Sequence, residues 1–493
     1  EAPPMNVILI ITDTMRRDHL GLYGCERVHT PNLDRLAQQS CVFENAYAAS
    51  FPTVPNRMDI MTGRFTFTEA GWQPLPREAT VVSEVLGAGG YTTMLVADTP
   101  HILANAYGYD RGFAGWEWIR GQENDRWRTA PADPELPAAP EKLRNPAVVK
   151  QHLRNTWHRK GEEDTFVART MRAAGDWLAE NADRDFFLYV DTFDPHEPWD
   201  APQEYVDRYD PGYEGDRVSY PVYGQADYLS ERELQHLRAL YAAEVTLVDA
   251  QVGRLLDRVE SLGLADDTAI IYTTDHGFFH GEHGWTGKSF IWEGGYRDMP
   301  LYSEVARIPL MIRMPGGPRG ERRECFAQPP DIMPTILELA GVETPETVQG
   351  MSLVPVMSGG RDHTRPFAIS TPTLALAPSG GRPTTIVEGD WALVYYGAPD
   401  GPLMNSLTRN VDDIPRHAVG APGRVPVPEL YDLKHDPQQK YNVYEENRDI
   451  AVKLHADHVH FMEELGMEER YLDQRRQLQA DTILGGLFDQ HLG

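Results

Sequence analysis

Short runs of apolar residues recur along the chain and predict strands that are buried on both faces. The first run is Asn-Val-Ile-Leu-Ile-Ile-Thr at residues 6–12, and the others lie at residues 91–97, 186–190, 269–274 and 308–313. Apolar residues at helical spacing predict helices at residues 30–39, 81–88, 229–262 and 331–340. Buried strands that alternate with helices are typical of α/β proteins, so we expect a large, mostly parallel central sheet flanked by helices.

Two parts of the chain depart from this alternation. Residues 99–165 are rich in Trp, Pro and charged residues and show little periodicity, so we expect a long excursion at the active site. After about residue 360, residues 384–387 and 392–396 predict short antiparallel strands, and residues 448–465 predict a helix. The 493 residues, 41% of them hydrophobic, suffice for two structural units. We expect a catalytic α/β domain at residues 5–360 and a smaller C-terminal α+β subdomain at residues 361–493.

The charge balance limits the kinds of partner. The formal net charge of −28 disfavours binding to nucleic acids and to anionic membranes, and no apolar run is long enough to span a membrane. An anion-binding site must therefore create its own local positive field. Cys25, Cys41 and Cys325 follow no metal or disulfide spacing, which favours a reducing cytoplasmic setting, or the periplasm if a signal segment has been removed. The composition leaves open whether the chain forms a homo-oligomer.

The segment Thr53-Val54-Pro55-Asn56-Arg57 predicts a site for a tetrahedral oxyanion. Its proline favours a helix start, which puts Thr53 near the N-cap and Arg57 one turn further on the same face. The unpaired N–H groups and the positive end of the helix dipole then point at the anion that the hydroxyl attacks.

Acidic residues follow two of the apolar strands and predict a metal site. Asp13 comes directly after the first strand, and Asp275 and His276 come directly after the strand at 269–274. Ligands of open α/β sheets bind beyond the carboxyl ends of the strands, and carboxylates beside an apolar core need a charge partner. Together with the Thr53 oxygen these residues make a mixed O/N shell, which suits Zn or Mn, with Ca and Mg as alternatives. The competing interpretation is that the two acids only cap turns or pair with neighbouring arginines.

The Thr53 segment, followed by Thr62-Gly63-Arg64, resembles the nucleophile signature of the sulfatase branch of the alkaline phosphatase superfamily. Six further segments match motifs of this family in the family's order: Asp13 to Gly21, Thr30 to Ala37, Asp194 to Pro198, Thr274 to Gly277, Asp331 to Thr335 and Glu429 to Pro437. The resemblance implies a sulfatase-like α/β fold with a metal ion held by Asp13, Asp275 and His276. It also implies that His196 and Lys288 contact the substrate and that Arg57 orients the nucleophile.

The chain departs from the family pattern at several substrate positions. Many relatives have a second acid where this chain has Thr14, and the family's lysine-containing segment is replaced by residues 98–101, so that only His101 can act there. An insertion after Lys288 makes the register uncertain, and Arg297 competes with Lys288 as the cationic contact. His283 is a further candidate to contact the substrate or the leaving group.

The decisive departure is Thr53 itself. Sulfatases of this branch oxidise a Cys or Ser at this position to formylglycine, a route closed to threonine because its Cβ already carries a methyl group. Threonine nucleophiles beside such a metal site resemble the phosphodiesterase and phosphoethanolamine-transferase branches of the superfamily. The missing lysine and the lack of a clear second metal site favour an ester with a single negative charge.

We therefore predict a metal-dependent hydrolase that cleaves a small anionic ester through a covalent Thr53 intermediate, with phosphodiesters or phosphonate monoesters as substrates. The alternatives are a sulfatase, a phosphate monoesterase of the same fold, or a non-catalytic sulfatase-like protein.

Overall fold

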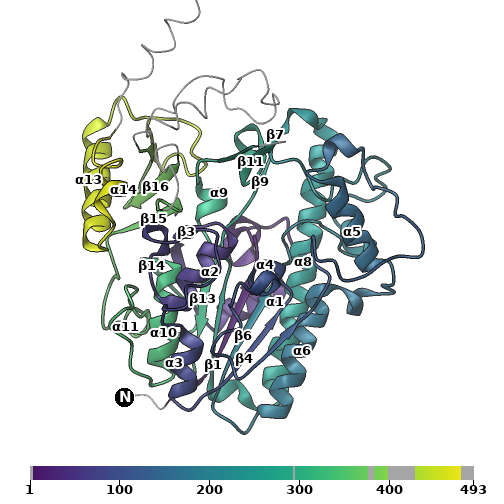
Figure 1. Cartoon of the computed structure of the whole chain (residues 1–493), viewed down its shortest axis with the longest axis horizontal. Coiled ribbons are helices and arrows are strands. Elements are labelled where there is room, and N and C mark those ends of the chain that lie inside the picture. Colours follow the sequence, from purple (N-terminus) through teal and green to yellow (C-terminus); the bar gives the residue numbers. More distant parts are fainter. Residues whose placement is uncertain (1–3, 293–294, 376–381, 398–427, 479–493) are drawn as a thin grey trace, which may run out of the picture.

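A computed structural model describes residues 4–292, 295–375, 382–397 and 428–478. Its centre is an eight-stranded sheet in the order β14-β2-β13-β8-β1-β6-β4-β5 (Figure 1). These strands are β1 Asn6–Thr12, β2 Cys41–Ala46, β4 Thr92–Ala97, β5 Gly115–Trp118, β6 Phe186–Thr192, β8 Thr268–Thr273, β13 Leu310–Arg313 and β14 Glu321–Ala327. Only β13 runs antiparallel to its neighbours, β2 and β8, so the mostly parallel α/β sheet is confirmed.

Strand β1 is the middle of the core because both of its faces are covered. Residues 7–11 are fully buried, and the strand pairs in parallel with β6 on one side and β8 on the other. Ile8 and Ile10 belong to one hydrophobic cluster, whereas Val7, Leu9 and Ile11 belong to a second. Successive side chains of a strand point to opposite faces, so this unbroken apolar run fills both layers.

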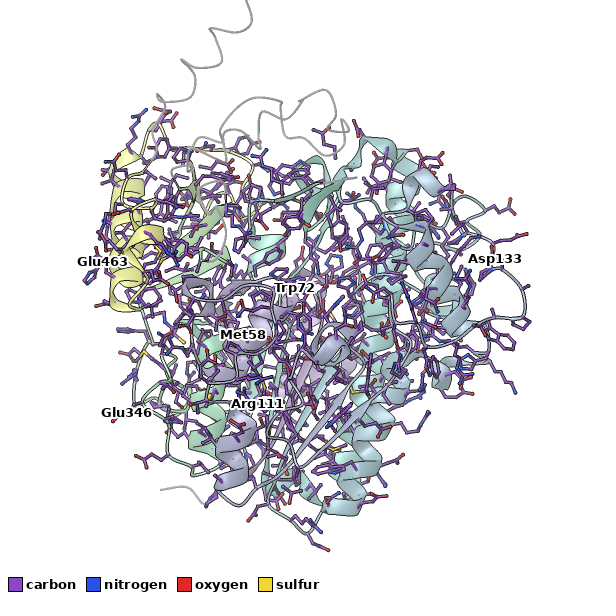
Figure 2. All side chains as sticks on the ribbon, viewed as in Figure 1. Met58, Trp72, Arg111, Asp133, Glu346 and Glu463 are labelled. Carbon is purple, nitrogen blue, oxygen red and sulfur yellow. The ribbon has the colours of Figure 1, made fainter. Side chains whose placement is uncertain are left out.

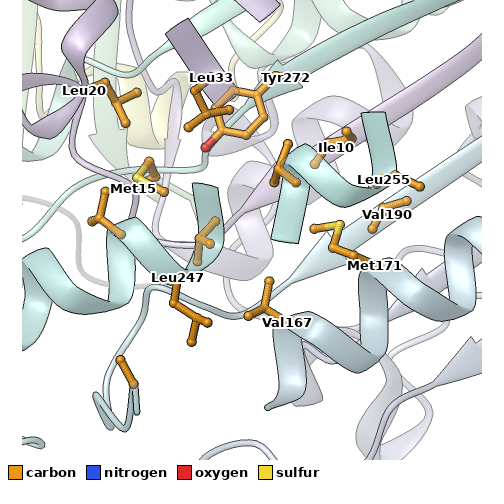
Figure 3. Close-up of a cluster of buried hydrophobic side chains, with 14 of the residues drawn as sticks. Ile10, Met15, Leu20, Leu33, Val167, Met171, Val190, Leu247, Leu255 and Tyr272 are labelled. Carbon is orange, nitrogen blue, oxygen red and sulfur yellow. The ribbon is translucent and has the colours of Figure 1, made fainter. Parts of the chain in front are cut away.

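Helices cover both faces of the sheet (Figure 1). The first cluster contains side chains of α1 Pro31–Gln38, α6 Phe166–Asn181 and α8 Glu231–Ser261, and some of its residues, including Ile10, Met171 and Leu255, are drawn in Figure 3. The second cluster contains side chains of α2 Thr53–Thr62, α3 Val82–Ala88, α10 Ile332–Leu339 and α11 Val354–Met357. Met58 of α2 is buried in this layer, whereas Asp133, Glu346 and Glu463 lie at the periphery (Figure 2).

A second sheet of five strands has the order β18-β17-β16-β15-β3. It is formed by β3 Ser50–Phe51, β15 Phe367–Pro372, β16 Pro383–Glu388, β17 Trp391–Tyr396 and β18 Glu429–Asp432. Helix α13 Arg448–Glu464 shares a hydrophobic cluster with this sheet. Strand β3 comes from the N-terminal part of the chain and pairs with β15, so the division expected at residue 360 stays a prediction.

The remaining α-helices and strands have at most four residues each, except α5, which has 11 residues. They are α4 Pro100–Leu103, α5 Pro146–Thr156, α7 Gln203–Val206, α9 Ser303–Ala306, α14 Glu469–Leu472, β7 Gly224–Gln225, β9 Phe279–His280, β10 Trp285–Gly287, β11 Ser289–Trp292 and β12 Gly295–Asp298.

The stretch at residues 99–165 is more regular than expected. It supplies β5, an edge strand of the main sheet, and helix α5. Asn145 caps α5 by accepting hydrogen bonds from the backbone N–H groups of Ala147 and Val148, and Pro146 occupies the first helical position. Asn followed by Pro is a helix-start signal, so the helix was readable from the sequence.

A buried ion pair links the start of α10 to the segment before β15. Arg365 donates to both carboxylate oxygens of Asp331 at 2.7 and 2.5 Å, and Asp331 is fully buried. The same carboxylate accepts backbone N–H groups of Gln328 and Met351, each at 2.8 Å. The carboxylate thus holds three chain segments together.

Replacement of Arg365 by Met should lower the free energy of unfolding by about 3–5 kcal/mol, because it leaves a buried carboxylate without its cation. Denaturant unfolding measures this change. Arg361→Met is the matched control, since Arg361 is exposed, and it should change the free energy of unfolding by less than about 0.5 kcal/mol. Equal stability of the two variants would show that the ion pair contributes nothing.

Candidate active site

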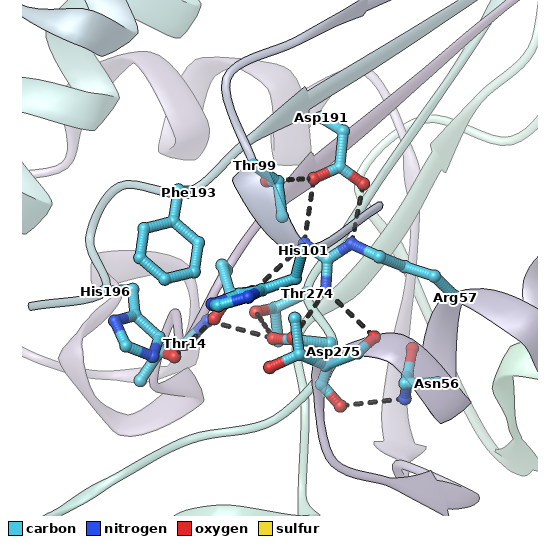
Figure 4. A network of polar contacts seen from close by, with 12 residues as sticks. Thr14, Asn56, Arg57, Thr99, His101, Asp191, Phe193, His196, Thr274 and Asp275 are labelled. Carbon is cyan, nitrogen blue, oxygen red and sulfur yellow. Dashed lines mark hydrogen bonds and ion pairs between the residues drawn. The ribbon is translucent and has the colours of Figure 1, made fainter. Parts of the chain in front are cut away.

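The candidate site lies where β1, β8 and β6 end. Asp13 follows β1, and Asp275 and His276 follow β8. Because β1 and β8 are parallel neighbours, their carboxyl ends meet at the same edge of the sheet. Helix α2 begins at Thr53 beside this edge, since Thr53 Oγ1 is 3.4 Å from His276 Nε2. The polar network at this point is drawn in Figure 4.

Asp13, Asp275 and His276 fit a divalent metal ion. Their ligand atoms all lie within 4.8 Å of one another, and all three side chains are fully buried. Asp13 Oδ2 is buried and makes no hydrogen bond to the described residues, although it lies 3.1 Å from the cationic Arg57 Nη2 atom, so it can still accept a metal ion. His276 Nδ1 donates to the carbonyl of Gly277 at 3.0 Å, which leaves Nε2 with its lone pair for a metal.

The electrostatics of these three side chains also suit a cation. Burial raises the pKa of Asp13 well above its usual value, and the charge of Asp275 adds to this. Burial also acts to raise the pKa of Asp275, but His276, Arg57 and Lys288 together lower it below its usual value. Burial lowers the pKa of His276 to about 3, so its imidazole is neutral near pH 7, as a metal ligand must be.

Arg57 is the fully buried cation beneath this cluster. Its Nε and Nη2 atoms each donate to Asp191 at 2.8 Å, and its Nη1 atom donates to Asp275 at 2.7 Å. Its Nη2 atom also lies 3.1 Å from Asp13 Oδ2. The contact with Thr53 is to the backbone carbonyl, at 3.2 Å, so Arg57 fixes the carboxylates and the helix start, and its guanidinium is not turned toward the cavity.

Asp191 is a residue of this network that the sequence interpretation missed. It lies near the end of β6 and also accepts hydrogen bonds from Thr99 Oγ1 at 2.6 Å and from the Tyr189 hydroxyl at 2.8 Å. The rule that singled out Asp13 and Asp275, an acid at the carboxyl end of an apolar strand, applies to Asp191 as well. The alternative that Asp13 pairs with Arg16 is not what the structure has, because Arg16 binds Asp18 and Glu282.

Thr53 lies at the floor of a cavity of about 720 Å³. The N-cap of α2 is Pro52 and Thr53 is the first helical residue, with its hydroxyl 3.4 Å from His276 Nε2. Of the predicted substrate contacts, His101, His196 and Lys288 line this cavity. Lys288 Nζ is 3.2 Å from His276 Nε2, which brings it close to the metal ligands.

Two predicted contacts are not among the described residues that line the cavity. His283 lies 3.5 Å from Glu304, and its ring packs against Tyr302 at 4.3 Å between centroids. Arg297 lies on β12, opposite Phe290 of β11. The uncertain register after Lys288 was the reason for including Arg297, and the insertion expected there stays a prediction.

Other charged and aromatic side chains complete the cavity wall. Arg144 and Glu123 come from the aperiodic stretch at 99–165, and Tyr220 and Tyr223 come from the loop before β7. Arg382 and Asp298 also line the cavity. The composition of residues 99–165 indicated an active-site segment but did not indicate which of its residues face the cavity.

A family model described as Sulfatase matches residues 5–342 of the chain. The chain belongs to the sulfatase family. The N-acetylglucosamine-6-O-sulfatase of Bacteroides thetaiotaomicron is 25% identical over 503 residues, which cover 89% of this chain and 82% of that protein. The multifunctional alkaline phosphatase superfamily protein PehA of Trinickia caryophylli is 27% identical over 516 residues, covering 89% of this chain and 91% of that protein.

The crystal structure of the phosphonate monoester hydrolase of Agrobacterium radiobacter has a similar fold. The two structures align with a TM-score of 0.68 at 21% sequence identity, over 93% of this chain and 95% of that chain. As a member of the sulfatase family the protein is an ester hydrolase, and enzymes of this family are metal-dependent. None of its described helices is both long and apolar enough to cross a membrane.

Replacement of Asp275 by Asn should weaken binding of Mn²⁺ and Zn²⁺ by roughly 100-fold or more, because the metal loses a charged ligand. Equilibrium dialysis with elemental analysis measures this directly. Asp249→Asn is the control, since Asp249 is a buried carboxylate of α8 that holds the start of α1 outside the cluster. Unchanged affinity in the Asp275 variant would contradict the assigned metal site.

Proposed function

We propose that this sulfatase-family protein hydrolyses phosphodiesters or phosphonate monoesters and that Thr53 is its nucleophile. Asp13, Asp275, His276 and the Thr53 oxygen would hold a divalent ion, with Mn or Zn preferred for a mixed O/N set. When bound, such an ion neutralises charge on the ester and lowers the pKa of a neighbouring hydroxyl.

The position of the Thr53 hydroxyl carries this proposal. It is 3.4 Å from His276 Nε2, at the first residue of α2, and it lines the cavity although the residue is only 1% exposed. A hydroxyl that served only the fold would be expected to cap the helix or bond to a carbonyl, as Thr62 does with Met58 at the other end of α2. The N-terminus of α2 also directs its unpaired N–H groups and positive dipole toward an attacked anion.

The choice of phosphorus over sulfur follows from the chemistry of threonine. Its Cβ carries a methyl group, so Thr53 cannot become a formylglycine that releases sulfate by collapsing to an aldehyde. A threonine ester must instead be cleaved at the central atom, which suits a phosphoryl or phosphonyl group with in-line displacement.

The charges of the cavity wall favour a substrate with one negative charge. Three cations of the described residues line the cavity, but Arg144 pairs with Glu123 at 2.8 Å, and Arg382 lies 3.8 Å from Asp298. Lys288, which contacts His276, is the lining cation for which no carboxylate partner is found among the described residues. A phosphate monoester with nearly two charges would need more free positive charge than this wall offers.

In the proposed reaction the Thr53 alkoxide attacks phosphorus while Lys288 binds a non-bridging oxygen. His196 donates a proton to the departing oxygen, since of the two candidates, His196 and His283, it is the one that lines the cavity. Burial lowers the pKa of His196 well below its usual value, helped by Lys288 and Arg144. An anionic ester bound at Lys288 offsets that positive charge and favours protonated His196. Water then hydrolyses the Thr53 ester and returns a proton to His196.

Sulfate ester hydrolysis is the second candidate, and the comparison with the N-acetylglucosamine-6-O-sulfatase over 89% of the chain favours it. The two candidates predict opposite rankings in a panel of 4-nitrophenyl esters of sulfate, phosphate, phenylphosphonate and a phosphodiester.

Replacement of Thr53 by Ala should lower kcat on the preferred 4-nitrophenyl ester by roughly 1,000-fold or more, because the nucleophile is gone. Thr53→Ser keeps the hydroxyl and should retain turnover well above that of the Ala variant. Acid quenching of the wild type during turnover should leave a phosphoryl or phosphonyl mass increment on the peptide that contains Thr53.

Thr62→Ala is the matched control, because it removes a buried hydroxyl from the same helix, and it should keep its activity. Near-normal rates in Thr53→Ala would rule out Thr53 as nucleophile. Faster turnover of 4-nitrophenyl sulfate than of both the phenylphosphonate ester and the phosphodiester would instead favour the sulfatase alternative.

A further inference from the structure

A group of charged side chains on one wall of the cavity connects the two cavity histidines. Arg144 lies between two glutamates: its Nη2 atom is 2.8 Å from Glu123 Oε1 and 3.4 Å from Glu197 Oε1. The guanidinium also lies over the rings of Tyr220 and Tyr223, 4.1 and 4.2 Å from their centroids.

Each glutamate divides its two oxygens in the same way. The Oε1 atoms face Arg144 and accept a tyrosine hydroxyl, from Tyr220 at 2.7 Å for Glu123 and from Tyr223 for Glu197. The Oε2 atoms face histidines: Glu123 Oε2 is 3.0 Å from His101 Nε2, and Glu197 Oε2 is 3.2 Å from His196 Nδ1. One arginine thus joins two carboxylate–histidine pairs.

Burial and strain indicate that this arrangement is specified by the fold. Glu123 and Glu197 are 4% and 0% exposed, and two acids this deeply buried are costly unless they are paired. Glu123 also adopts a φ of 45°, in the left-handed region that non-glycine residues rarely occupy. Strained backbone of this kind persists only where surrounding contacts enforce it and is common at functional sites.

The geometry around His196 fixes where its proton is held. Its Nδ1 atom donates to the Glu197 carbonyl at 2.6 Å, so Nδ1 keeps a hydrogen in both protonation states and only Nε2 gains or loses one. Its ring is stacked on Phe193, 4.0 Å between centroids, which limits rotation. A carboxylate next to Nδ1 stabilises the imidazolium form, which the buried site otherwise disfavours.

Resting on the proposed function, we propose that Arg144, Glu123 and Glu197 are positioning residues for His101 and His196. The backbone carbonyl of Glu197 holds the Nδ1 hydrogen of His196, and the charge of the Glu197 carboxylate, 3.2 Å from Nδ1, stabilises the protonated ring for proton transfer from Nε2. As the bond between the central atom and the leaving oxygen breaks, its electron pair stays on that oxygen, which takes the Nε2 proton. His196 becomes neutral and keeps its Nδ1 hydrogen. In the second step Nε2 accepts a proton from the water that cleaves the Thr53 ester.

The role of Arg144 is to offset the cost of burying both carboxylates. Burial raises the pKa of Glu197, and Arg144 and Lys288 act to lower it. The pKa of Glu123 is lowered to about 2 although burial opposes this, because His101 and Arg144 outweigh it. Removal of Arg144 would leave the two buried carboxylates without the cation that lies between them, which weakens the support that Glu197 gives to protonated His196.

The test compares two esters that share one phenylphosphonate group but differ in their leaving group, 4-nitrophenol and phenol. The first leaves readily without protonation, whereas the more basic phenolate depends on a proton donor. Glu197→Gln should lower kcat by about 100-fold on the phenyl ester and by less than about fivefold on the 4-nitrophenyl ester. Arg144→Met, which keeps an apolar stem over the tyrosines, should shift the same ratio in the same direction.

Glu244→Gln is the matched control, since it also replaces a buried carboxylate by an amide but lies outside the cavity wall. It should change both esters equally. An equal loss on both esters in Glu197→Gln and in Arg144→Met would overturn the positioning role, because a structural defect does not distinguish leaving groups.

This outcome is separable from failure of the proposed function. If the wild type turns over only sulfate esters, the same comparison is made with 4-nitrophenyl and phenyl sulfate, and the ratio tests the positioning residues independently of the central atom. If one variant does not fold, as judged by thermal unfolding, the other still decides.

Discussion

The active site depends on how the buried charge of Arg57 is compensated. This guanidinium has no solvent contact and is surrounded by three fully buried carboxylates, those of Asp13, Asp191 and Asp275. A single buried cation cannot balance three carboxylates, and Lys288 nearby supplies only one further positive charge. A surplus of buried negative charge is stable only if a carboxylate is protonated or a cation binds. Asp13 Oδ2 is the carboxylate oxygen of the three that makes no hydrogen bond to the described residues, and its contact with Arg57 is an ion pair at 3.1 Å. The charge balance around Arg57, as well as the ligand geometry, therefore favours a cation at Asp13, Asp275 and His276.

The same residue connects the site to both sheets. Arg57 belongs to α2, whose start is held by β3, and β3 is an edge strand of the C-terminal sheet through its pairing with β15. Asp59 of the same helix accepts hydrogen bonds from Ser50 and Thr66 on either side of it. Helix α2 is thus held in two ways. Arg57 binds the acids at the ends of β1, β6 and β8, and β3, which precedes the helix, belongs to the second sheet. Positioning on rigid elements rather than on a loop would suit the nucleophile role proposed for Thr53.

Sequence alone predicted the parts of this structure that are set by local pattern. Strands such as β1 and β8 are long apolar runs, helix α8 has a Ser230–Glu233 capping box, and the acids that follow β1 and β8 were readable as a metal pair. Strand β5, with the sequence Gly-Trp-Glu-Trp, and β2, with only three apolar residues at its start, lack such a pattern and depend on tertiary pairing. The positions of side chains on loops could not be predicted from local sequence pattern either. Arg144 is placed by a backbone hydrogen bond from its N–H to the carbonyl of Tyr220, a residue far away in the sequence. His283 was expected to contact the substrate, but its ring lies 3.5 Å from Glu304.

A strongly acidic protein can bind an anion if its free positive charge lies next to the reacting group and not elsewhere on the cavity wall. The chain has a formal charge of −28, so its long-range field opposes an approaching anionic ester. At the cavity wall, Arg144 is bound to Glu123 and Arg382 lies near Asp298, which leaves little positive charge away from the reacting group. For the proposed reaction the attraction would have to arise at short range, from Lys288, the start of α2 and a cation at the candidate metal site. Binding energy concentrated on the reacting group stabilises the charge that develops there in the transition state, whereas cations at the cavity mouth would only tighten ground-state binding.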